Sequence, residues 1–111
     1  MRRSKRTKAC DISHATKEAL WERDGGCIFC RMGYYPPAEP QTMWDAMHYI
    51  PRSRGGLGIM QNAAIGCRYH HQMLDQGAEG RRPEMLKLFR LYLMDKYPGW
   101  EESALVYDRW K

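Results

Sequence analysis

Two short motifs constrain the fold of this chain more than any other feature of its sequence. Cys27-x-x-Cys30 and Cys67-x-x-His70 are separated by 36 residues and together offer three thiols and one imidazole. This ligand set is typical of a tetrahedral structural Zn²⁺ site, in which two chelating halves join distant parts of a chain.

A redox pair at Cys27 and Cys30, or a set of unrelated thiols, are the alternatives to a zinc site. A thioredoxin-like pair lacks its βαβ setting here, and a reducing cytoplasm disfavours stable disulfides. The spacing therefore favours zinc. The fourth cysteine, Cys10, is predicted to be a small buried hydrophobic residue.

The stretch 46–75 predicts a strand, a loop, a second strand and a helix. Residues 46–50 are β-prone and end at a proline, which cannot donate a hydrogen bond to a sheet. The loop carries Arg52, Arg54 and three glycines, which allow positive φ and the close approach of another backbone. Residues 63–66 are apolar and can return antiparallel to the first strand. Residues 68–76 lack Gly and Pro, and Gly77 stands where a helix C′ residue is expected.

The predicted helix 68–76 can serve two metal ions on two faces. His71 and Asp75 are four residues apart and point together, whereas His70 is turned by about 100° and shares a face with Cys67. An imidazole and a carboxylate at this spacing suit a divalent cation that also holds water and phosphate oxygens. Taken alone, such a pair is most often a surface ion pair, so its neighbours decide the interpretation.

This segment resembles the HNH endonuclease motif, whose fold is the ββα-metal finger, in small stand-alone proteins of phages and prophages. The resemblance rests on His48 before I-P-R-S-R-G-G-L-G, on Asn62 after that loop, and on His71 nine residues further on. It implies a small α+β fold and an enzyme that nicks duplex DNA. The enzyme would use a catalytic Mg²⁺, Mn²⁺ or Ni²⁺. By the same resemblance, His48 is the general base and Asn62 orients the water or completes the metal site. His71 binds the metal, with Asp75 as the second helix ligand.

One position departs from the family pattern. The residue before the first histidine binds the metal in many HNH enzymes, but here it is Met47, a poor ligand for hard cations. Asp45 is predicted to lie on the opposite strand face from His48, because side chains alternate along a strand. The competing hypothesis is therefore a zinc-stabilised module without strong activity that binds DNA or a partner such as a phage packaging protein.

The remaining chain predicts a single nuclease domain over 10–111 behind a flexible basic arm over 1–9. The net charge of +5 lies in that arm, because the other 13 basic residues balance the 13 acidic ones. We expect the protein to contact the DNA backbone through Arg52, Arg54 and the arm residues Arg2, Arg3, Lys5, Arg6 and Lys8.

Helices are predicted on both sides of the core over 44–77. Ser13 is a plausible N-cap for a helix that runs to about Arg23, and Pro83 opens a helix to about Tyr97 with a wide apolar stripe. A short helix over 103–109 completes a C-terminal helical segment, 83–111. No apolar run approaches a membrane span and no export signal is evident, which predicts a cytoplasmic protein.

Overall fold

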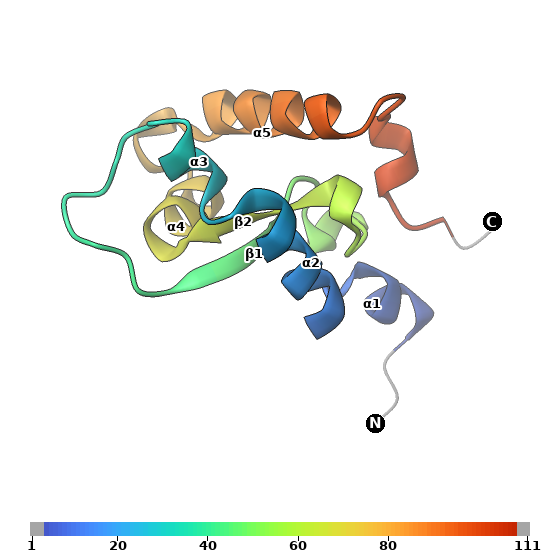
Figure 1. Cartoon of the computed structure of the whole chain (residues 1–111). Coiled ribbons are helices and arrows are strands. Elements are labelled where there is room, and N and C mark those ends of the chain that lie inside the picture. The colour runs from blue at the N-terminus through green and yellow to red at the C-terminus, as the bar shows by residue number, and fades with distance from the viewer. Residues whose placement is uncertain (1–3, 109–111) are drawn as a thin grey trace.

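A computed structural model describes residues 4–108 as a small α+β fold with one two-stranded antiparallel sheet (Figure 1). The strands are β1 (Trp44–His48) and β2 (Ala63–Cys67), and the helices are α1 (Lys5–Cys10), α2 (His14–Asp24), α3 (Ile28–Arg31), α4 (Arg68–Gln76) and α5 (Arg82–Lys96). None of the helices within 4–108 combines the length and the apolar character needed to cross a bilayer.

The sheet separates two clusters of buried side chains. In the larger cluster Met47 and Ala64 pack with side chains of α3, α4 and α5, including Phe29 and Phe89. In the smaller cluster Ala63 and Ile65 of β2 pack against Leu20 of α2. Figure 1 shows α5 running above the sheet. Both faces of β2 are therefore covered, and all five of its residues are buried.

A buried ion pair fixes the end of α2 to β2 and α5. The Asp24 carboxylate accepts hydrogen bonds from the Ile65 amide (2.8 Å), the Tyr92 hydroxyl (2.6 Å) and the adjacent Arg23 guanidinium (2.6 Å). Arg23 also donates to the Ala63 carbonyl at 2.7 Å. A buried charge is tolerated only when it is paired and hydrogen-bonded, and here both charges are.

The order of the central elements matches the strand, loop, strand and helix of the sequence analysis. Helix α4 has the predicted bounds and ends at Gly77, which adopts the left-handed conformation. The predicted helices from Ser13 and Pro83 are observed as α2, with Ser13 as its N-cap, and α5. The first strand lies two residues earlier than predicted.

The prediction of a flexible basic arm is wrong for Lys5, Arg6 and Lys8, which belong to α1. Arg2 and Arg3 lie outside the described residues. The Ser4 side chain caps α1, and its one buried residue, Cys10, anchors it while the charged side chains remain exposed. The charged segment can therefore form a helix because the buried Cys10 fixes its C-terminal end.

The glycine-rich loop between the strands is packed between α1 and the segment that contains Leu105. The Gly58 amide donates to the Ala9 carbonyl (2.9 Å), and a Cβ at Gly58 would overlap the backbone of Asp11. On the other side, the Leu57 amide donates to the Leu105 carbonyl (2.8 Å). The close backbone approach predicted from the glycines is confirmed at Gly58.

The C-terminal segment folds back on the loop. The predicted short helix over 103–109 is a single 3₁₀ turn, Glu102–Leu105, with Leu105 buried. Trp100 donates its indole N–H to the Gln61 carbonyl (2.7 Å). Residues 109–111 lie outside the described part of the chain.

Candidate functional site

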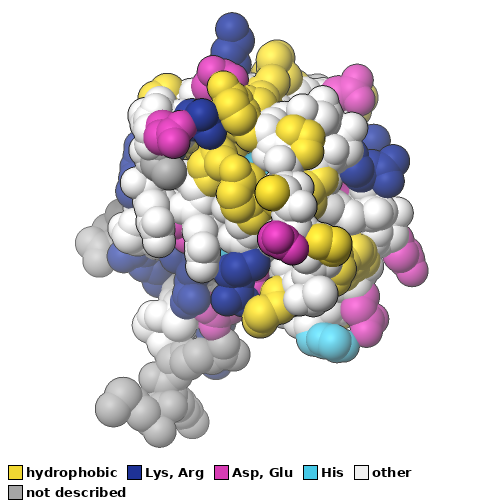
Figure 2. Space-filling model, turned by 90° about the vertical axis from the view of Figure 1, so that its left-hand side faces the viewer, with side chains coloured by type: hydrophobic (Ala, Val, Ile, Leu, Met, Phe, Trp, Pro, Cys, Tyr) yellow, Lys and Arg dark blue, Asp and Glu magenta, His cyan; other side chains and the backbone are white. Residues whose placement is uncertain are grey.

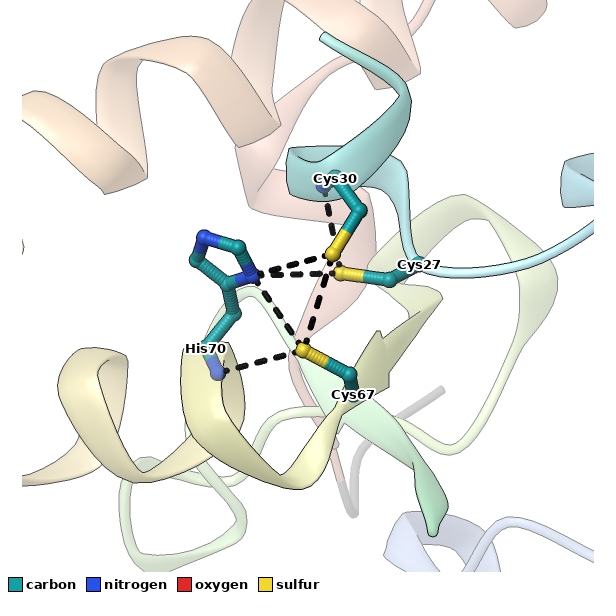
Figure 3. Close-up of side chains that lie close together, drawn as sticks. All are labelled: Cys27, Cys30, Cys67 and His70. Carbon is teal, nitrogen blue, oxygen red and sulfur yellow. Dashed lines mark hydrogen bonds between the residues drawn. The ribbon is translucent and has the colours of Figure 1, made fainter. Parts of the chain in front are cut away.

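The two predicted metal-binding motifs come together as one cluster of four side chains (Figure 3). Cys27 and Cys30 lie at the start of α3, while Cys67 ends β2 and His70 lies in the first turn of α4. Their ligand atoms all lie within 4.8 Å of one another. None of the four cysteines, all within residues 4–108, forms a disulfide. The cluster can hold a metal ion such as zinc.

The distances in this cluster fit a tetrahedral zinc ion. The Cys30 and Cys67 sulfurs are 3.7 Å apart, and the His70 Nδ1 lies 3.5, 3.5 and 3.2 Å from the Cys27, Cys30 and Cys67 sulfurs. Bond lengths of about 2.3 Å to sulfur and 2.0 Å to nitrogen place tetrahedral ligands about 3.5 to 3.8 Å apart. These four distances are therefore close to those of a tetrahedral zinc site.

The histidine of the cluster presents the correct nitrogen. His70 Nε2 lies 2.7 Å from the Tyr34 carbonyl, to which it can only donate, so in the neutral ring the Nδ1 lone pair faces the sulfurs. A backbone carbonyl commonly fixes the tautomer of a metal-binding histidine in this way. The sequence identified His70 but not this partner.

The thiols of the cluster need a cation to ionise together. Burial opposes ionisation of Cys27, but the hydrogen bond with His70, hydrogen bonds with the backbone and the charge on His70 together outweigh it, and the pKa of Cys27 is lowered to about 6. Burial and the charge on Cys27 raise the pKa of Cys30 to about 12, and burial raises the pKa of Cys67. A bound Zn²⁺ stabilises all three thiolates at once.

A second candidate site is an open cleft of about 800 Å³ on the other face of α4. It runs along the edge of β1 that faces away from β2, the one strand paired with it within residues 4–108, and reaches the glycine-rich loop. The side chains that line it and carry chemistry are Lys17, Asp45, His48, Arg52, Arg68, His71, Asp75 and Arg82.

His48 lies in this cleft with one ring nitrogen engaged. Its Nε2 lies 2.8 Å from the Cys10 carbonyl at the end of α1 and donates to it, so Nδ1 is the unprotonated nitrogen of the neutral ring. Burial lowers the pKa of His48, as do the positive charge of Arg52 and nearby His71, against the opposing effects of the Cys10 carbonyl and Asp11. His48 is therefore neutral at pH 7 and able to accept a proton.

His71 and Asp75 point together, as their spacing predicted. The His71 Nε2 lies 3.2 Å from an Asp75 carboxylate oxygen. The other ring nitrogen, Nδ1, lies 2.9 Å from Asp45, a residue that the sequence analysis left outside the site. Asp45 also accepts two hydrogen bonds from Arg68, at 2.9 and 3.2 Å.

Asp45 and His48 both line the cleft, although strand alternation places them on opposite faces of β1, because the cleft follows the edge of that strand. Met47, between them, is fully buried in the core. Gly66 on β2 leaves room for the Met47 thioether, which a Cβ at that position would overlap. Methionine at this position therefore serves packing.

Asn62 does not reach the cleft. Its side chain is buried and accepts from the Ile50 amide (2.8 Å) while donating to the carbonyls of Ile50 (3.1 Å) and Leu57 (2.8 Å). The prediction that Asn62 contacts the metal or the water is therefore wrong. Its side-chain amide instead holds the backbone of the loop that follows His48, at Ile50 and Leu57.

The basic residues of the cleft differ partly from those predicted. Arg52 lines the cleft and forms an ion pair with Asp11, whereas Arg54 is exposed outside the lining. Lys17 and Arg82 join the lining, which sequence spacing did not indicate. Figure 2 shows Lys and Arg side chains gathered below a band of hydrophobic ones on the face at the left of Figure 1.

No protein-family model, curated protein or solved structure matches the chain. A function is therefore assigned from the chemistry of the cleft and of the four-residue cluster Cys27, Cys30, Cys67 and His70.

Proposed function

We propose that the protein is a metal-dependent DNA endonuclease of the HNH type, stabilised by a structural zinc ion on Cys27, Cys30, Cys67 and His70. The observation that carries the proposal is the cleft, in which His48 lies on the same surface as the His71–Asp75 pair. The succession of β1, β2 and α4 supports it, since this is the order of elements in a ββα-metal finger.

The residues of the cleft divide the work of phosphodiester hydrolysis. His48 removes a proton from the attacking water through Nδ1, because its Nε2 proton is donated to the Cys10 carbonyl. His71 and Asp75 would hold a divalent cation, which when bound supplies Lewis-acid activation of the phosphate and stabilisation of the leaving oxygen. Lys17, Arg52 and Arg82 line the cleft where they can bind the flanking phosphates.

The alternative function is DNA binding without cleavage, alone or as part of phage DNA packaging. The two functions are separated by incubating supercoiled plasmid with the zinc-loaded protein and Mg²⁺, Mn²⁺ or Ni²⁺. We expect the nicked form to appear only with an added cation, and to be lost in His71→Ala. Plasmid binding without nicking under all three metals would contradict the nuclease and support the binding module.

The pH dependence of nicking is expected to follow the neutral form of His48. Its pKa is lowered below the ordinary value of about 6.5, so the rate should fall on the acidic side with a midpoint below pH 6.5. Arg52→Gln removes a positive charge that lowers this pKa, so the acidic limb should move to higher pH. The measurement is kcat/KM for plasmid nicking against pH. A wild-type limb centred above pH 6.5 would be inconsistent with this assignment.

A further inference from the structure

The two nitrogens of the His71 ring are held by two carboxylates with different surroundings. Nδ1 lies 2.9 Å from Asp45, whose side chain is 24% exposed, and Nε2 lies 3.2 Å from Asp75, whose side chain is 63% exposed. A neutral imidazole carries one N–H and one lone pair, so it can donate to only one of the two carboxylates. The surroundings of Asp45 and Asp75 determine which one.

Asp45 is the carboxylate built to accept that proton. Arg68 holds it with two hydrogen bonds, through Nε and Nη2, to both carboxylate oxygens. Asp45 is therefore a fixed acceptor, whereas the solvent-exposed Asp75 carboxylate is free to reorient.

We propose that Asp45 is a positioning residue that accepts the Nδ1 proton of His71 and thereby directs the Nε2 lone pair, together with Asp75, at a divalent cation. This proposal rests on the proposed nuclease function. Metal-binding histidines commonly donate their second ring N–H to a carboxylate, which fixes the tautomer and the ring orientation.

The spacing of the two cation-facing atoms supports this assignment. Adjacent ligands of an octahedral cation at about 2.1 Å lie about 3.0 Å apart. The His71 Nε2 and the Asp75 oxygen are 3.2 Å apart, so a cation can contact both after a small adjustment of the exposed carboxylate. Asp45 lies on the opposite side of the ring and acts through His71.

The first measurement is the tautomer of His71, from imidazole ¹⁵N chemical shifts in the zinc-loaded full chain at pH 7.5 without other divalent cations. We expect Nδ1 to be protonated and Nε2 to be bare. Arg68 Nε and His71 Nδ1 both contact Asp45 Oδ2, and Arg68 Nη2 contacts Oδ1. In Asp45→Asn an amide –NH₂ replaces one of these two acceptors with a donor and the negative charge is lost, so the proton should move toward Nε2 and the charged Asp75. Arg68→Met keeps the carboxylate but removes the two hydrogen bonds that hold it, so it should move the proton toward Nε2 less than Asp45→Asn does.

The second measurement is Mn²⁺ affinity, from electron paramagnetic resonance titration of the same proteins. Asp45→Asn should bind Mn²⁺ about 10 to 100-fold more weakly, while Asp95→Asn, an exposed carboxylate on α5, should bind like wild type. Zinc content and circular dichroism verify that each variant is folded.

The outcomes separate this proposal from the nuclease proposal. A His71 ring protonated on both nitrogens, an unchanged tautomer in Asp45→Asn, or an unchanged Mn²⁺ affinity in that variant overturns the role of Asp45 and leaves the nuclease standing. Wild-type protein that binds no Mn²⁺ in the cleft and nicks no plasmid overturns the nuclease itself.

Discussion

Cys67→Ser is expected to abolish cooperative folding of the domain. Cys67 joins β2 to α4, and its sulfur lies 3.7 Å from that of Cys30 on α3, so the cluster ties three elements together. Zinc contributes about 10–16 kcal/mol of apparent binding free energy in zinc-finger peptides, which is comparable to the whole stability of a small domain, about 5–15 kcal/mol. Loss of a ligand or chelation of the metal should therefore remove most of the melting transition seen by circular dichroism.

Cys10→Ala is the matched control for this prediction. Cys10 is also a buried free thiol, but it is not a member of the four-residue cluster. The control should keep one zinc ion per chain, measured by mass spectrometry, and should lose only the modest stability of a small buried side chain. A Cys67→Ser protein that retains its zinc and melts within a few degrees of wild type would show that the cluster is not a structural metal centre.

His48→Ala is expected to lower the rate of metal-dependent plasmid nicking by about 10²–10⁴-fold, the usual contribution of a general base. The alanine cannot accept the proton from water, and the proposed metal ligands His71 and Asp75 remain unchanged. Single-turnover nicking at saturating protein isolates this step from DNA binding. Binding of the plasmid should change little, because the imidazole carries no charge at neutral pH.

His14→Ala provides the matched histidine control. His14 lies on the exposed face of α2 and pairs only with Glu18 among the contacts described for its side chain within residues 4–108. Its loss should leave nicking within twofold of wild type. Equal rates for His48→Ala and wild type would assign proton transfer to another group and remove His48 from the site.

Local signals in the sequence were sufficient to predict the cluster of Cys27, Cys30, Cys67 and His70 and to predict α4. Each of the two motifs places two ligands at a chelating spacing. Residues 68–76 contain no Gly or Pro, and Gly77 marks the end of the helix. The shared face of His71 and Asp75 follows from helix geometry alone. These features depend on neighbours within a few residues, which a sequence displays directly.

The parts that were missed depend on contacts between distant segments. Helix α1 is charged enough to resemble a free arm, and only its docking against the Gly58 loop brings the Cys10 carbonyl to His48. Asn62 matched the family pattern, yet its amide is used by the loop backbone. Asp45 was left outside the site because alternation along β1 does not show that a cleft at the strand edge takes side chains from both faces.

The central claim is that α4 carries two metal sites on two faces, and anomalous diffraction from crystals of the zinc-loaded protein soaked in Mn²⁺ tests it most directly. The proposal predicts a zinc peak surrounded by Cys27, Cys30, Cys67 and His70, and a separate manganese peak beside His71 Nε2 and Asp75. Manganese absent from the cleft at saturating concentration, with His71 still bridging Asp45 and Asp75, would contradict the account.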